Sequence, residues 1–333
     1  MIGFFVGIAQ LYSRLRAFPR ILPGPRRQNG LMFSRRKILK LLAGVPAMAV
    51  IPPARSAGAP LKRAIPKTGE LLHAVGLGTW QTFDVGGDAG GRAAAREVLA
   101  RFVKAGGQMV DSSPMYGSSE SVVGELAADL GVEKSLFLAT KVWSNGREAG
   151  MRQMEESLRR MRVKRIDLMQ VHNLTDAKTQ LNTLREWKVQ GRIRYLGITH
   201  YHEGAYAELE RLIKSEQLDF AQFNYNVVTT AAEERLLPVC AEYRTAVIVN
   251  RPFEEGELFR RVKGRELPKW AREFDCNSWA RFFLKFILAH PAVTCAIPAT
   301  RNPDYLVDNM GAALGRLPDA AMRRRMVQHM RSL

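Results

Sequence analysis

The chain has 333 residues, of which 46% are hydrophobic, so it can bury a full core in one large α/β domain or in two smaller ones. Its formal net charge is +18, which would suit nucleic acid or an anionic membrane if the charge were spread along the chain. However, no Asp or Glu precedes Glu70, and ten basic residues lie within residues 1–56, which leaves +8 for the rest. Basic and aromatic residues are not interleaved, and this argues against nucleic-acid binding.

The N-terminal residues predict a targeting segment. The sequence SRRKILK at residues 34–40 resembles a twin-arginine (Tat) export signal, with Ile38 where that signal usually has Phe. The apolar run at residues 38–51 is shorter than the roughly 20 residues of a membrane span but suits the apolar part of a signal peptide. Small residues then predict cleavage after Ser56. We therefore expect the Tat machinery to export the protein to the periplasm, and the mature protein to have no stable membrane span.

Two features of this segment stay open. An ordinary signal peptide would begin at Met32, so we expect translation to begin there rather than at Met1. If the arginine pair is only a chance feature of an Arg-rich stretch, the protein would remain in the cytoplasm.

From residue 65 onward, short apolar runs alternate with longer segments of helical periodicity, the pattern of parallel strands joined by crossover helices. We expect strands at residues 75–80, 108–111, 136–141, 166–172, 193–199, 219–224, 246–250 and 293–297. We expect helices at residues 91–104, 118–129, 150–161, 177–190, 205–215, 232–243, 277–289 and 303–314. A small hairpin at residues 65–72 precedes the first strand and is a candidate plug for the bottom of a barrel.

Eight strands favour a single closed (β/α)8 TIM barrel over residues 57–333, with residues 1–56 as the targeting segment. The main alternative, an open doubly wound sheet, would usually carry a Gly-rich phosphate-binding turn after its first strand. The glycines at residues 84–91 do not fit the GxGxxG pattern and are better interpreted as a flexible loop.

Four polar residues fall where the expected strands end, which is where the chemistry of such a barrel is found. Asp111, Lys141 and His172 end the second, third and fourth strands, and Tyr116 lies in the loop after the second. Each residue alone is more often a capping, packing or solvated side chain. Their convergence at one end of a barrel predicts an active site.

These residues belong to stretches through which the chain resembles the aldo-keto reductases, across residues 62–315. The matching stretches are GLGTW at 76–80, Asp111 followed by SSPMYGSSE at 112–120, TK at 140–141, DLMQVH at 167–172, QFNY at 222–225 and IP at 297–298. The resemblance implies an NAD(P)H-dependent enzyme that reduces aldehydes or ketones to alcohols. It also implies that Asp111, Tyr116, Lys141 and His172 form the catalytic tetrad.

The chemistry of the four side chains supports the implied roles. A phenol with a pKa near 10 is a poor acid at neutral pH, and we expect the ammonium group of Lys141 to lower that pKa. Asp111 would hold Lys141 in place, while Tyr116 would donate its proton to the carbonyl oxygen. His172 would orient the carbonyl and help to stabilise the charge on its oxygen.

The resemblance further implies a nicotinamide cofactor, NADP in preference to NAD. The residues implied to hold it are Thr199, His200, Gln222, Asn250, Arg251, Thr300, Arg301, Asp308 and Asn309. The chain departs from the family pattern at several of these positions. Thr199 and His200 stand where Ser and Asn are usual, and Asn250 stands where an aromatic ring usually stacks on the nicotinamide. Ala299 and Tyr305 replace a lysine and an arginine, which leaves Arg301 as the candidate partner of a 2′-phosphate.

Trp80 and Trp143 follow strand ends and are candidates to line the substrate pocket, although packing at the rim would explain them equally well. Residues 319–333 predict a solvated basic helix rather than an aromatic lid, so we expect an open site. The three widely spaced cysteines predict neither a disulfide framework nor a metal site, and His200 and His202 lack further ligands at a suitable spacing. A low-turnover nicotinamide-binding sensor or partner subunit on the same barrel is the alternative function.

Overall fold

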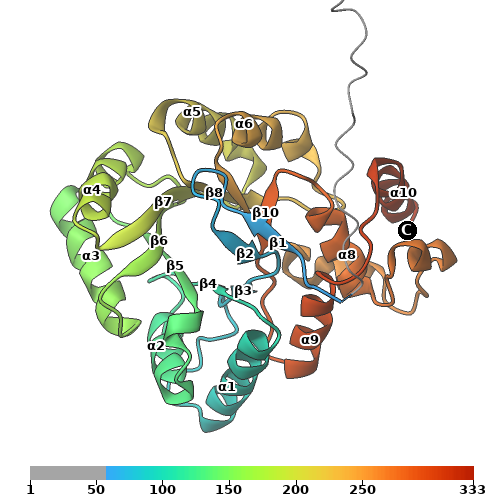
Figure 1. Ribbon diagram of the computed structural model, residues 1–333, viewed down its shortest axis with the longest axis horizontal. Coiled ribbons are helices and arrows are strands. Elements are labelled where there is room, and N and C mark those ends of the chain that lie inside the picture. The colour runs from blue at the N-terminus through green and yellow to red at the C-terminus, as the bar shows by residue number, and fades with distance from the viewer. Residues whose placement is uncertain (1–57) are drawn as a thin grey trace, which may run out of the picture. The chain divides into compact units, whose positions relative to one another are not determined.

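The computed structural model describes residues 58–333, so the predicted export signal, its cleavage site and the start at Met32 lie outside the described residues. Eight parallel strands, β3 to β10, form one sheet in chain order. Parallel bridges between Val75 and Ala296 and between Gly78 and Ala299 join the two edges of this sheet. The strands therefore close into the expected (β/α)8 barrel, with the helices arranged around it (Figure 1).

The barrel strands lie within two residues of their expected positions. They are β3 (Leu77–Gly78), β4 (Met109–Asp111), β5 (Phe137–Val142), β6 (Ile166–His172), β7 (Ile193–Thr199), β8 (Phe220–Asn224), β9 (Ala246–Asn250) and β10 (Val293–Ala296). Parallel strands that are covered on both faces are nearly continuous apolar runs, which is why the sequence locates them well. All six residues of β5 are buried, for example.

The expected helices also form, and their ends follow local capping signals. They are α1 (Ala89–Lys104), α2 (Ser119–Leu130), α3 (Arg147–Arg160), α4 (Ala177–Val189), α5 (Tyr206–Glu216), α6 (Leu236–Glu242), α8 (Trp279–Leu288) and α9 (Pro303–Gly311). The Asp88 carboxylate accepts hydrogen bonds from the first free N–H groups of α1, and Asn302 does the same for α9. Gly131 ends α2 in the left-handed conformation, with φ of 65°.

Four elements differ from expectation. α7 (Glu257–Arg261) and the 3-10 helix η6 (Lys269–Phe274) lie in a stretch without apolar periodicity, and α6 begins late because residues 231–233 form a separate 3-10 turn. The C-terminal helix α10 (Ala320–Arg331) was expected to be solvated, which is wrong for one of its faces. Met326 and Met330 are fully buried on that face, and Arg323 pairs with Glu233 at 2.5 Å.

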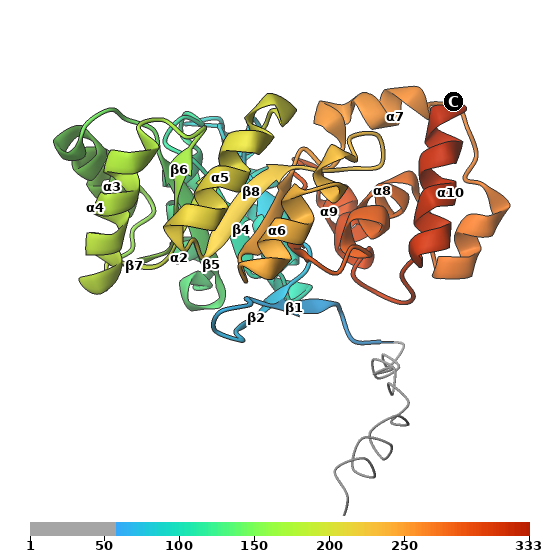
Figure 2. The ribbon, with the colours of Figure 1, turned by 90° about the horizontal axis from the view of Figure 1, so that it is seen from above.

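The hairpin that precedes the barrel closes its bottom. Its strands, β1 (Lys62–Ala64) and β2 (Leu71–His73), pair antiparallel and lie beneath the barrel in the side view (Figure 2). Leu72 joins the apolar layer inside the barrel together with Phe137 and Phe220. At the end of the turn, the Tyr195 hydroxyl donates to the Glu70 carboxylate at 2.6 Å. The open end of the barrel is therefore the opposite one, where the strands terminate.

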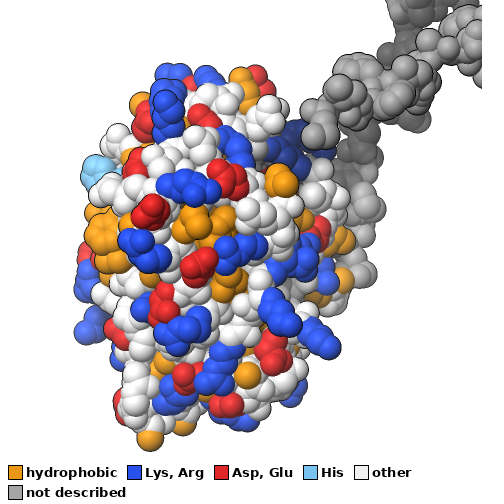
Figure 3. All heavy atoms as spheres, turned by 90° about the vertical axis from the view of Figure 1, so that its left-hand side faces the viewer, with side chains coloured by type: hydrophobic (Ala, Val, Ile, Leu, Met, Phe, Trp, Pro, Cys, Tyr) orange, Lys and Arg blue, Asp and Glu red, His pale blue; other side chains and the backbone are white. Residues whose placement is uncertain are grey.

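The face of the barrel over α3 and α4 carries charges of both signs, which are intermixed (Figure 3). Ion pairs on this side join neighbouring elements, as between Arg147 and Glu186 at 2.5 Å. Exposed pairs of this kind each stabilise a fold by only about 0–1 kcal/mol. Among residues 58–333, no helix is long and apolar enough to cross a bilayer.

Candidate active site

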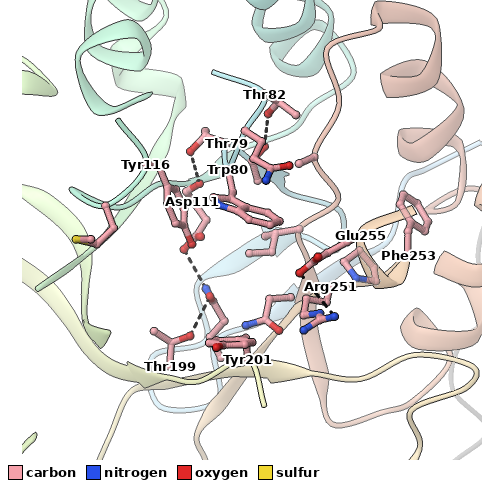
Figure 4. Close-up of a pocket in the computed structure, with 18 of the residues that line it drawn as sticks. Thr79, Trp80, Thr82, Asp111, Tyr116, Thr199, Tyr201, Arg251, Phe253 and Glu255 are labelled. Carbon is pink, nitrogen blue, oxygen red and sulfur yellow. Dashed lines mark hydrogen bonds and ion pairs between the residues drawn. The ribbon is translucent and has the colours of Figure 1, made fainter. Parts of the chain in front are cut away.

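The barrel brings the four predicted catalytic residues to the carboxyl ends of adjacent strands. Asp111 is the last residue of β4 and pairs in register with Ala139, two residues before Lys141 in β5. His172 is the last residue of β6. Tyr116 lies in the loop between β4 and α2, and the close-up shows its side chain beside Asp111 (Figure 4).

The centre of the site is a buried ion pair. Lys141 Nζ lies 2.6 Å from Asp111 Oδ2 and also donates to Ser112 O at 2.6 Å, and the side chains of both charged residues are at most 3% exposed. The other carboxylate oxygen, Oδ1, accepts from Gln170 at 3.2 Å and from Gln222 at 2.9 Å. Burial lowers the pKa of Lys141, but Asp111 and Tyr116 together raise it by more than burial lowers it, so the net pKa lies above its usual value. The ammonium group therefore keeps its proton at all physiological pH values.

The Tyr116 ring lies over this ammonium group, with its centroid 5.0 Å from Lys141 Nζ. Burial raises the pKa of Tyr116, Lys141 lowers it in part, and the net pKa is above its usual value. The expectation of a lowered pKa is therefore wrong for the net shift, because desolvation of the phenol outweighs the attraction of the ammonium group. Tyr116 is thus a protonated phenol at neutral pH, and its anion, once formed, lies beside a fixed positive charge.

His172 is neutral in this environment. Burial lowers its pKa to about 3, with further contributions from the charges of Lys141 and His200. Its Nδ1 lies 3.1 Å from the Ser113 hydroxyl, and its ring meets the Tyr116 ring edge-on with centroids 6.0 Å apart. When Ser113 donates to Nδ1, the proton of the imidazole is on Nε2, which can then donate to a substrate oxygen.

Two residues that position the site were not singled out from the sequence. Gln170 steadies Asp111, and Ser113 holds His172. Gln170 stands two residues before His172, so the period of two along a strand could have placed its side chain on the same inward face. Ser113 lies within the stretch that resembles the aldo-keto reductases, but its partner comes from a strand 59 residues away.

A pocket of about 790 Å³ opens at this end of the barrel. Its wall includes seven of the predicted residues besides Asp111, and the close-up shows several of them around one hollow (Figure 4). These seven are Trp80, Tyr116, His172, Thr199, Gln222, Asn250 and Arg251. Lys141 is not on the wall but lies behind Asp111, to which it is bonded.

The other predicted residues lie outside this wall. Trp143 is 41% exposed, with its ring centroid 6.4 Å from that of His172, so it stands at the rim of the site. His200 stacks on Tyr201, and its carbonyl oxygen accepts from Asn250 at 3.3 Å. The predicted catalytic side chains and the residues predicted to hold the nicotinamide are thus gathered at the pocket. The residues predicted for the phosphate and adenosine end of the cofactor, which are Thr300, Arg301, Asp308 and Asn309, lie outside its wall.

The adenosine-end residues have partners within the protein. Arg301 donates to the carbonyl oxygen of Gln81 beside a second, more open hollow. Asp308 pairs with Arg281 at 2.8 Å, while Asn309 and Thr300 are largely buried. A phosphate partner for Arg301 would therefore have to compete with an existing hydrogen bond.

Polar atoms at the pocket fit a nicotinamide dinucleotide. Among the described residues, Asn250 Oδ1, Arg251 Nε and Gln170 Oε1 are buried without a hydrogen-bond partner, and the first two belong to residues of the pocket wall. An unpaired acceptor suits the N–H groups of a carboxamide, and an unpaired guanidinium donor suits a phosphate. Gln222 contributes less than expected, because its amide donates to Asp111 and accepts from Thr199 at 3.0 Å.

The chain is similar in sequence and in fold to known aldo/keto reductases. Residues 74–325 match the family model described as the aldo/keto reductase family. The methylglyoxal reductase YeaE of Escherichia coli is 28% identical over 246 residues, which cover 72% of this chain and 84% of that protein. An NADH-specific methylglyoxal reductase of the same species is 27% identical over 233 residues, covering 60% of this chain and 70% of the relative. A solved aldo/keto reductase from Klebsiella pneumoniae, in complex with NADP and acetate, shares the fold with a TM-score of 0.66 at 22% identity, covering 79% and 93% of the two chains.

The fold, the site and these relatives together define an NAD(P)-dependent oxidoreductase built on a (β/α)8 barrel. The match extends over most of the chain. The protein belongs to the aldo/keto reductase family.

Proposed function

We propose that the protein reduces the carbonyl group of an aldehyde or ketone to an alcohol, with Tyr116 as proton donor and NADPH as reductant. The observation that carries this proposal is the buried pair of Lys141 and Asp111 beneath the Tyr116 ring. A protonated phenol beside a fixed ammonium group can release its proton without leaving an unpaired negative charge in a buried site.

The proposed mechanism assigns a distinct task to each side chain. When bound, the reduced nicotinamide supplies a hydride to the carbonyl carbon. Tyr116 donates its proton to the carbonyl oxygen, which completes the alcohol, and the resulting tyrosinate is stabilised by Lys141. Neutral His172, held by Ser113, donates a hydrogen bond to the same oxygen and directs it toward Tyr116.

The choice of NADP over NAD is also a proposal. A guanidinium group matches the geometry of a 2′-phosphate, and Arg301 is exposed at the hollow beside the pocket. One E. coli relative is named as NADH-specific, so the family includes both preferences. Titration with NADPH and NADH side by side decides this point: we expect tighter binding of NADPH, and a preference for NADH would contradict the proposal.

The substrate is proposed only as a carbonyl compound. Because the E. coli relatives are named as methylglyoxal reductases, methylglyoxal belongs in the first panel, together with larger aldehydes and ketones. We expect the purified protein to oxidise NADPH in the presence of at least one member of that panel. Trp80 and Trp143 are proposed to contact the substrate, because one lines the pocket and the other stands at its rim.

A low-turnover sensor or partner subunit is the second candidate. It is motivated by the pocket wall, where Asn250 replaces an aromatic ring and Gln222 is engaged with Asp111 and Thr199. Tight binding of cofactor without turnover on any carbonyl would favour this function over the first.

We further propose that the protein acts in the periplasm after Tat-dependent export. This rests on the SRRKILK sequence at residues 34–40 and on the apolar run that follows it. Because the Tat machinery carries folded proteins, the barrel would bind its cofactor in the cytoplasm and cross the membrane with it.

A further inference from the structure

The charges on the pocket wall are few. Among the residues that line it, only Asp111, Arg251 and Glu255 are charged at neutral pH. Asp111 is already neutralised by Lys141. Arg251 is therefore the one cation of the described pocket wall, and Glu255 is the anion beside it (Figure 4).

Arg251 is held in place but not fully bonded. It follows the last residue of β9 and has a positive φ of 48°. Its terminal nitrogen lies 2.9 Å from the Glu254 carboxylate and 3.6 Å from that of Glu255. Its Nε is buried without an acceptor. A guanidinium with an unused, buried N–H in a pocket wall is suited to receive one more acidic group.

The two glutamates differ in how firmly they are held. Glu254 is fixed, because its carboxylate also accepts from Asn226 at 2.6 Å and from Thr229 at 3.0 Å. Glu255 is 48% exposed, and within residues 58–333 its only ion pair is the long one with Arg251. Glu255 can therefore leave Arg251 without breaking a second contact, whereas Glu254 cannot.

We propose that Glu255 is a displaceable counter-ion of Arg251 and that a phosphate group of the dinucleotide replaces it as the partner of Arg251. This inference rests on the proposed function, because it requires the cofactor to occupy this pocket. A phosphate is a better partner for a guanidinium than a half-exposed carboxylate at 3.6 Å, since it can form two parallel hydrogen bonds. The displaced Glu255 then faces a ligand of like charge, so it lowers cofactor affinity and favours release.

The dissociation constant of NADPH measures this directly, by calorimetry or by quenching of the fluorescence of Trp80 in the pocket wall. We expect Glu255→Gln to tighten NADPH binding by about 2- to 5-fold at low ionic strength, the scale of one exposed ion pair. The gain should shrink at high salt, because exposed charges are screened. Glu257→Gln is the matched control. Glu257 is about equally exposed but pairs with Arg260, and neither residue lines the pocket, so this substitution should leave the dissociation constant unchanged.

A double-mutant cycle separates displacement from simple repulsion. Arg251→Gln alone should weaken NADPH binding, and in that background Glu255→Gln should have clearly less effect than in the wild type. If the wild type binds NADPH and Glu255→Gln does not change the dissociation constant, the inference is overturned while the proposed function stands. An equal effect of Glu255→Gln with and without Arg251→Gln would overturn it in the same way. A wild type that binds neither NADPH nor NADH would overturn the proposed function as well.

Discussion

The buried pair of Lys141 and Asp111 is the residue-level feature on which the site depends. Two unit charges removed from water are costly unless each is fully bonded, and here the carboxylate receives an ammonium group and two amides. This arrangement fixes the position of the ammonium group beneath Tyr116. The same pair therefore contributes both to the stability of the barrel and to its proposed chemistry.

Removing one partner of this pair should destabilise the fold. We expect Lys141→Met to lower the free energy of unfolding by about 3–5 kcal/mol, because Asp111 is left as an uncompensated buried charge. Urea denaturation followed by circular dichroism measures the change. The double variant Lys141→Met/Asp111→Asn should lose less than the single one, and a greater loss in the double variant would contradict this account.

The neutral state of His172 predicts a specific pH dependence. Because its pKa is about 3 in the folded protein and near 6.5 in an unfolded chain, the unfolded chain binds more protons below about pH 6.5. Its contribution to stability is therefore complete above pH 6.5 and is lost as the pH falls toward 3. We expect the unfolding free energy of the wild type to fall more steeply over this range than that of His172→Gln.

The same property applies to catalysis. We expect the pH profile of kcat/KM for a carbonyl substrate to show no inflection near pH 6.5 that is due to His172. The profiles of the wild type and of His172→Gln should therefore have the same shape in this range. Such an inflection would mean that the imidazole titrates in the accessible range and that burial does not hold it neutral.

At the scale of elements, the hairpin formed by β1 and β2 seals one end of the barrel and leaves the other for the pocket. Adjacent leucines in β2 provide a matched test, since Leu72 is fully buried and Leu71 is 55% exposed. Leu72→Ala should lower the free energy of unfolding by about 2–5 kcal/mol, because it leaves a cavity in the apolar layer. Leu71→Ala should change it by no more than about 0.5 kcal/mol in the same denaturation experiment. Similar effects of the two substitutions would contradict the claim that the hairpin packs into the bottom of the barrel through Leu72.

The sequence predicts most elements of the barrel because buried parallel strands are short, nearly continuous apolar runs that stand between helices with clear ends. It fails for α7 and η6, which lie in a stretch held by packing and ion pairs rather than by periodicity. Within the site, the sequence places Asp111, Lys141 and His172 near strand ends and Tyr116 in the loop that follows β4, and the structure brings these four residues together. The net pKa shift of Tyr116 does not follow, because the balance between burial and the ammonium charge depends on distances that only the fold defines.

Contacts between distant segments of the chain cannot be predicted from the sequence either, because they too depend on distances that only the fold defines. The pairing of Arg301 with Gln81 and of Asp308 with Arg281 joins residues that are far apart in the chain or lie on different helices. The roles of these residues toward a cofactor therefore remain predictions.

At the scale of the whole molecule, the barrel and the N-terminal segment have separate proposed roles. The barrel carries out the proposed carbonyl reduction, while residues 34–56 contain the proposed export signal. Replacement of both Arg35 and Arg36 by Lys should keep the protein in the cytoplasm, since the Tat signal depends on the arginine pair. Cell fractionation measures this, and a location identical to that of the wild type would contradict export without affecting the enzyme assignment.

The central claim is that Tyr116 donates the proton in a carbonyl reduction driven by NADPH. The most direct measurement compares Tyr116→Phe with the wild type in both turnover and NADPH binding. We predict that kcat falls by about 10²- to 10⁴-fold, while the dissociation constant of NADPH stays within about twofold, because only the donated proton is removed. A kcat within about tenfold of the wild type would contradict the claim.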